Sequence, residues 1–122
     1  GTSALPSLFR YNPDGSVDAS FGSNGVAAVF IVVGVSSTFR DVALQADGGL
    51  LAVGGTASSG SDDILLVRFD SNGSVDTAFG SNGIVVTDVG GGNNWAYAAG
   101  IQGSGRIVVA GLAENVENNS YE

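Results

Sequence analysis

The chain alternates short apolar runs with clusters of Gly, Asn, Asp and Ser. Apolar runs of this length that are bounded by turn residues predict β-strands, and no stretch shows the periodicity of an amphipathic helix. We expect strands over residues 5–11, 26–33, 39–45, 50–55, 63–69, 84–89, 96–102 and 106–111. The pattern therefore predicts an all-β fold.

The polar turns between these runs repeat. Residues 15–25 have the sequence GSVDASFGSNG, and residues 73–83, 58 positions later, have GSVDTAFGSNG, with 9 of the 11 positions identical. A repeat at this period indicates a solenoid, a propeller or an array. We assign residues 1–122 to a single repeat domain, with one unit over about 5–62 and a second over about 63–122.

Each unit has four expected strands, which fits one blade of a β-propeller, a four-stranded antiparallel sheet. Two blades cannot close a ring, because propellers contain about 4–8 of them. The blade that begins near Trp95 lacks a strand equivalent to 63–69, and the strand at 5–11 lacks a blade of its own. We therefore expect β-propeller-type blades that are incomplete as a ring. A homo-oligomer or filament formed through strand completion, or adjacent repeats of a longer chain, would complete them.

The same residues resemble the delta-60 repeat family of bacterial β-propeller-like proteins. The resemblance rests on FRYNPDGSVDASFGSNGV, on VRFDSNGSVDTAFGSNGI and on DVALQADGGLLAVGG, and more loosely on AAGIQGSGRIVVAGL. The chain departs from the family pattern at Gly49 and at Gly103 and Ser104. The resemblance implies a propeller in a secreted or cell-surface bacterial protein, and it implies no catalytic activity.

Composition narrows the classes of function. The net charge is −8, the four basic residues are all Arg, and the chain has no Cys and no His. This charge disfavours nucleic acid and anionic membranes as partners, and no apolar run has the length of a membrane helix. Without His, Cys or Lys, carboxylate chemistry of the glycosidase type is the remaining catalytic option. We expect a protein that is not an enzyme and that does not insert into membranes.

Two acidic turns are the candidate metal sites. Their oxygen-bearing side chains occupy positions 1, 3 and 7 of each turn, and they are Asn12, Asp14 and Asp18, and Asp70, Asn72 and Asp76. Oxygen-rich loops with Gly after the third position are typical of calcium sites, which makes Ca²⁺ the candidate cofactor. Neither turn has the Glu that ends an EF-hand loop. The alternative is that these side chains form Asx-turns with nearby backbone N–H groups.

Four further residues are candidates for ligand binding. Arg10 and Arg68 stand at equivalent strand positions, where they either bind an anionic ligand in a central channel or pair with Asp18 and Asp76. Trp95 and Tyr97 have no aromatic counterparts in the first unit. They either stack on a carbohydrate or pack against a neighbouring blade. The sequence thus predicts a non-enzymatic scaffold or interaction module, with a lectin-like propeller as the alternative.

Overall fold

The computed structural model describes residues 5–31, 36–58, 60–115 and 120–121, and it is all-β. The strands within these ranges are β1 (Ser7–Phe9), β2 (Val26–Ala28), β3 (Ser37–Leu44), β4 (Leu50–Ser58), β5 (Ser61–Phe69), β6 (Ile84–Thr87), β7 (Gly91–Ile101), β8 (Ile107–Asn115) and β9 (Ser120–Tyr121). The described ranges contain no helix that is long and apolar enough to span a bilayer. The predicted fold class is confirmed.

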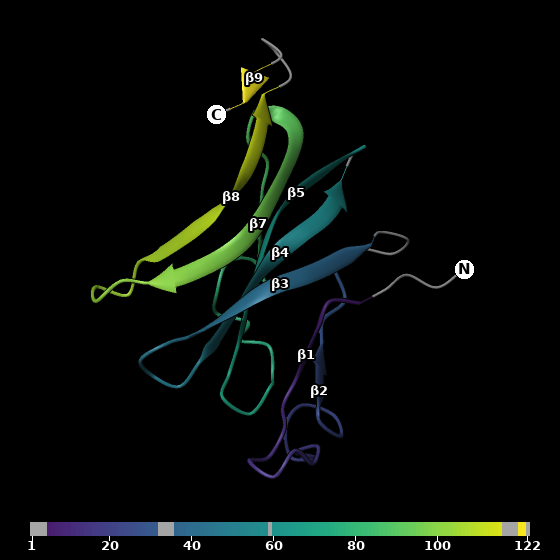
Figure 1. The fold of residues 1–122 in the computed structure, drawn as a ribbon, viewed down its shortest axis with the longest axis vertical. Helices are drawn as coiled ribbons and strands as arrows, with labels where there is room; N and C mark the ends of the chain where they lie inside the picture. The colour runs from purple at the N-terminus through teal and green to yellow at the C-terminus, as the bar shows by residue number, and fades with distance from the viewer. Residues whose placement is uncertain (1–4, 32–35, 59, 116–119, 122) are drawn as a thin grey trace.

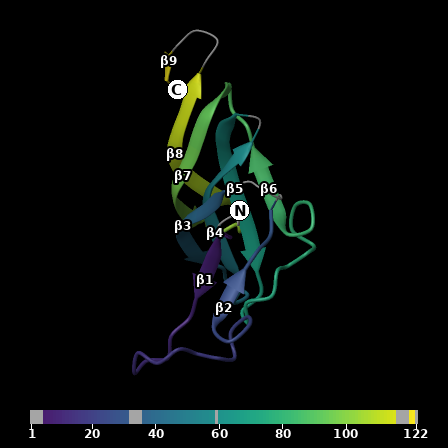
Figure 2. The same ribbon diagram turned by 90° about the vertical axis from the view of Figure 1, so that its right-hand side faces the viewer.

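The strands form three antiparallel sheets. β3, β4, β5 and β6 make a complete four-stranded blade in sequential order, while β1 and β2 make a two-stranded sheet and β7, β8 and β9 a three-stranded one. β3 and β4 cross between the β1–β2 pair and the β7–β8 hairpin (Figure 1). Figure 2 shows β6 and the β7–β8 hairpin on opposite sides of β5. The described residues therefore form one whole blade flanked by two partial blades.

The strands lie where the apolar runs predict them, but their lengths differ. β2 ends at Ala28, although the apolar run predicts a strand over 26–33, of which residues 32 and 33 lie outside the described ranges. β2 pairs with the three-residue strand β1, so the ladder available to it is short. β5 and β7 instead begin earlier than expected, because each extends along a long partner strand.

The core consists of two clusters on opposite faces of the complete blade. Because successive side chains along a strand point to opposite faces, Ala52 and Val67 belong to one cluster, while Leu51 and Val53 belong to the other. The first cluster joins the blade to the β1–β2 side through Phe21, and the second joins it to β7 and β8. Phe21 is fully buried, as expected of a core residue.

A β-bulge recurs at the equivalent place in each unit. The register shifts after Phe39 in the β3–β4 ladder and after Ala96 in the β7–β8 ladder. Gly54 and Gly111 lie opposite the two bulges, where a Cβ atom would overlap the backbone carbonyl oxygen just before the bulge. Glycine is therefore required at both positions by the close approach of the backbones.

Candidate functional site

The first acidic turn is closed by its own hydrogen bonds. Asp14 Oδ1 accepts from the backbone N–H of Ser16 at 3.0 Å and from the Ser16 hydroxyl at 2.6 Å. The hydroxyl and then the N–H of Ser16 hold the pKa of the Asp14 carboxyl below its ordinary value. Asn12 donates to the Ser16 hydroxyl oxygen at 3.0 Å. These contacts are those of an Asx-turn, so the side chains of Asn12 and Asp14 stabilise the turn.

The second acidic turn repeats this geometry with fewer contacts. Asn72 Oδ1 accepts from the backbone N–H of Ser74 at 3.2 Å, and Asp76 Oδ1 accepts from the N–H of Ala78 at 3.1 Å. Asp70 accepts through its backbone carbonyl from the Gly73 N–H at 2.9 Å. Among the residues that the structure describes, no three acidic side chains are grouped so that they could hold one metal ion.

The two equivalent arginines pair with the last carboxylate of their own turn. Arg10 Nε lies 2.9 Å from Asp18 Oδ2, and Arg68 Nε lies 2.7 Å from Asp76 Oδ2. The Ser20 hydroxyl is the largest cause that lowers the pKa of Asp18, with Arg10 a smaller one. The pairing that the sequence suggested is therefore present in both units.

Arg68 has further partners on the turn between β3 and β4. Its guanidinium donates to Gln45 Oε1 and to Asp47 Oδ2, each at 2.6 Å. The hydrogen bond with Asp47 raises the pKa of Arg68. The Gly49 N–H and then Arg68 lower the pKa of Asp47. Arg68 thus connects the first, second and third strands of the blade through their turns.

Among the residues that the structure describes, Arg10 has no contacts equivalent to these two. It donates instead to the Ser71 carbonyl oxygen at 2.7 Å, and its guanidinium carbon lies 4.5 Å from the centre of the Phe21 ring. The residues equivalent to Gln45 and Asp47 are Gln102 and Ser104, which lie in the turn between β7 and β8. The sequence gives no signal of this difference, because it depends on which strands share a sheet.

The aromatic pair on β7 is split between two environments. The indole N–H of Trp95 donates to Asp62 Oδ2 at 2.8 Å, and the side chain is half-buried. Tyr97 is exposed, and the Arg40 guanidinium lies 5.4 Å from the centre of its ring. Sequence reasoning missed Asp62 and Arg40 as partners, because they lie 33 and 57 positions away along the chain. The two aromatic side chains therefore have different polar partners.

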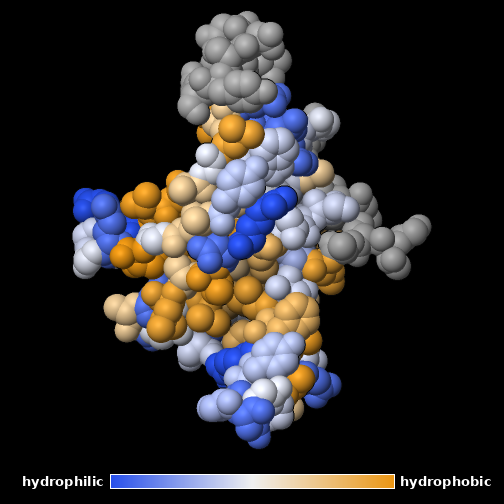
Figure 3. Space-filling model, viewed as in Figure 1, coloured by the Kyte–Doolittle hydropathy of each residue, from blue (hydrophilic) through white to orange (hydrophobic). Residues whose placement is uncertain are grey.

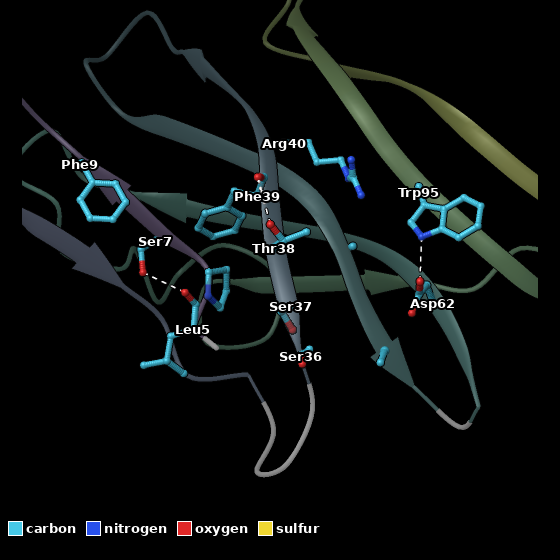
Figure 4. Close-up of a pocket in the computed structure, with 13 residues that line it drawn as sticks. Leu5, Ser7, Phe9, Ser36, Ser37, Thr38, Phe39, Arg40, Asp62 and Trp95 are labelled. Carbon is cyan, nitrogen blue, oxygen red and sulfur yellow. Dashed lines mark hydrogen bonds between the residues drawn. The ribbon is translucent and has the colours of Figure 1, made fainter. Parts of the chain in front are cut away.

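A hollow of about 530 Å³ lies between β1 and β3 and reaches Trp95. It is lined by Phe9 from β1, by Phe39 and Arg40 from β3, and by Trp95 from β7. Figure 4 shows Phe9 and Trp95 on opposite sides of Arg40. Both polar and aromatic groups therefore face this space.

Apolar side chains are exposed on the partial blades at positions where the complete blade buries them. The exposed residues are Phe9, Tyr11 and Val108. Their equivalents in the complete blade, in the same order, are the buried Val67, Phe69 and Leu51. On β3, Val42 and Leu44 are also exposed, although their equivalents on β7 pack against the complete blade. Figure 3 shows apolar side chains gathered across the middle of the same face as in Figure 1. The single chain therefore exposes apolar side chains at positions that the complete blade covers.

The fold and these surfaces define a protein built from β-propeller blades. A family model described as "Domain of unknown function (DUF5122) beta-propeller" matches residues 1–21 and 45–79. The matched ranges include the Arg-aromatic dipeptide of both units and the whole of both acidic turns. Together with the observed blade, this match supports a β-propeller repeat family. No curated protein shows a significant match to the chain.

Proposed function

We propose that the protein is a non-enzymatic scaffold and interaction module whose blades form part of a closed propeller ring. The observation that carries this proposal is the exposure of Phe9 and Val108, since the equivalent residues of the complete blade are fully buried. Homo-oligomerisation or further repeats of a longer chain would cover these residues. The ring would present an acidic surface to partners, because the net charge of the chain is −8.

The proposal includes a finer family and a location. The repeated turn and the Arg-aromatic strand resemble delta-60 repeats, and such proteins are secreted or held at the bacterial cell surface. The acidic composition supports an extracellular role. Expression in a bacterial host with a secretion signal, followed by fractionation, tests whether the folded protein accumulates outside the cytoplasm.

Light scattering coupled to size-exclusion chromatography tests the scaffold proposal. Propellers contain about 4–8 blades, so two blades per chain predict assemblies of two to four chains, with a mass two to four times the 12.1 kDa of one chain. A 12.1 kDa monomer with a cooperative thermal transition would contradict ring formation by this chain.

A lectin-like function is the second candidate, and the hollow beside Trp95 favours it. Aromatic faces and charged side chains are the groups that bind sugars, and Phe9, Arg40 and Trp95 line this space. A glycan array tests the idea. Binding that Trp95→Ala abolishes and Trp95→Phe retains would support a stacking role, since Trp95→Phe keeps an aromatic face while it removes the hydrogen bond to Asp62. Equal binding by both variants and the wild type would contradict it.

A further inference from the structure

The two partial blades are complementary parts of one blade. β1 and β2 are equivalent to β5 and β6, and β7 and β8 are equivalent to β3 and β4. We propose that β7–β8 of one copy and β1–β2 of a second copy pair into a composite four-stranded blade, in the register that joins β4 to β5. This inference rests on the proposed ring-forming function and specifies its partner, its strands and its register.

Within the described ranges, no strand pairs with β1 on the side away from β2. Arg10 N–H donates to the Gly25 carbonyl oxygen at 3.3 Å, and the Pro6 carbonyl oxygen accepts from Val29 N–H at 3.2 Å, so these groups face β2. Because backbone groups alternate sides along an antiparallel strand, the N–H and C=O groups of Ser7 and Phe9 face away from β2. The N–H that Pro6 lacks falls on the β2 side, so this proline does not interrupt the open edge.

β8 offers the matching open edge. Its pairing with β9 involves only Glu114 and Asn115, and within the described ranges no strand pairs with residues 107–113 on that side. Unpaired edges invite another chain. Within the described ranges, β1 and β8 therefore each have one edge whose backbone groups lack a partner strand.

The complete blade supplies the register. β4 and β5 pair Ala52 with Val67, Val53 with Leu66 and Gly54 with Leu65. Transferred to the equivalent positions, this register places Val109 opposite Phe9, Ala110 opposite Leu8 and Gly111 opposite Ser7. Gly111 would then occupy the same place beside its bulge and its partner strand as Gly54 does in the complete blade.

The same pairing buries the exposed apolar residues. Phe9 and Tyr11 lie on the face of β1 opposite Leu8, which packs into the core of its own chain. In the composite blade this face packs against the copy that supplies β7 and β8. Val108 of that copy then faces Val42 and Leu44 of the other copy, as Leu51 faces Ala99 and Ile101 in the core between β4 and β7. The hollow between β1 and β3 leaves space beside β1 (Figure 4).

The composite blade also completes the contacts of Arg10. In the complete blade, the equivalent Arg68 donates to Gln45 and Asp47 across the sheet. The second copy places Gln102 and Ser104 at these positions, so its β7–β8 turn supplies acceptors to the remaining guanidinium N–H groups. Arg10 is thus a docking residue whose partners come from another molecule.

Engineered disulfides test the register, since the chain has no Cys of its own. The backbone N–H and C=O groups of Leu66 point toward β6, so Leu66 and Val53 are a non-hydrogen-bonded pair of the β4–β5 ladder. Leu8 and Ala110 are the equivalent pair in the composite blade. The Cα separation of such a pair suits a disulfide. The double variant Leu8→Cys and Ala110→Cys is oxidised and run on denaturing, non-reducing gels. We expect covalent multimers that a reductant converts to the single chain. The matched control, Val53→Cys with Leu66→Cys, forms its disulfide inside one chain and stays at the mass of a single chain.

A second pair, Arg10→Cys with Val108→Cys, tests the same register if the Leu8 variant fails to fold. If the wild type and the cysteine variants are all folded oligomers but oxidation gives no covalent multimer, the composite blade is overturned while the proposed scaffold remains. A wild-type monomer would overturn both. Cross-linking by a displaced pair, Phe30→Cys with Ala110→Cys, to the same extent would also overturn the proposed register.

Discussion

Substitutions at Phe9 and Phe30 distinguish an effect on assembly from an effect on folding. The two side chains are 62% and 59% exposed in the single chain, so an Asp at either place perturbs the isolated chain to a similar extent. The residue equivalent to Phe9 is the fully buried Val67, whereas the residue equivalent to Phe30 is the exposed Asp88. We expect Phe9→Asp to weaken the assembly and Phe30→Asp to leave it unchanged.

The size of the effect follows from the burial that Phe9 gains. Complete burial of a Phe side chain contributes about 1.5–3 kcal/mol, so covering the exposed part of Phe9 contributes about 1–2 kcal/mol at each interface. A carboxylate in its place adds a desolvation cost of several kcal/mol. A total of about 3 kcal/mol weakens association more than a hundredfold.

The assay is the solution mass measured by light scattering over a dilution series. Wild-type protein and Phe30→Asp are expected to keep the oligomer mass at concentrations where Phe9→Asp has dissociated. Far-UV circular dichroism checks that both variants retain β-structure. Equal masses for the two variants at every concentration would refute the argument that Phe9 is buried between copies.

Three further perturbations test the fold and the turns. Gly54→Ala is expected to cost about 3 kcal/mol or more because its methyl group meets a backbone carbonyl, while Gly100→Ala, which has open space around it, should leave stability unchanged or raise it by up to about 1 kcal/mol. Urea unfolding measures both, and equal stabilities would contradict the bulge geometry. Arg68→Ala removes three contacts and is expected to cost about 2–3 kcal/mol in the same assay, far more than Arg106→Ala. The lowered pKa of Asp14 means that it stabilises the fold above the pKa of the unfolded chain, and that this contribution is lost as pH falls below about 4. Asp14→Asn should therefore lose less melting temperature than wild type between pH 5 and pH 2, and parallel losses would contradict the assignment.

The strands and turns could be predicted from the sequence because their causes are local. The Asn-Gly and Asp-Gly steps define the turns, and Asn24 and Asn82 adopt the left-handed φ values that such repeated turns require. The pairing of Arg10 with Asp18 spans eight residues within one turn and is likewise a local contact. The two units of the repeat support the same interpretation, because their turns have the same backbone geometry.

Contacts that depend on sheet packing could not be predicted from the sequence. Trp95 and Asp62 meet because β7 packs beside β5, and no local pattern relates them. Arg68 also contacts Gln45 and Asp47, and these contacts form because β3 and β5 belong to the same sheet. The difference between Arg10 and Arg68, which identifies the docking residue, therefore appears only when the blades are seen in space.

Hydrogen exchange at the backbone N–H of Phe9 tests the composite blade most directly. Val67 occupies the equivalent place in β5, beside β4, and provides the internal reference. If β8 of a second copy pairs with β1, the Phe9 N–H of the assembled wild type is protected from exchange to within about tenfold of the Val67 N–H. In the dissociated Phe9→Asp variant, the backbone N–H of residue 9 is expected to lose this protection. Fast exchange at Phe9 in the assembled wild type, with Val67 fully protected, would contradict the pairing of β1 with another copy.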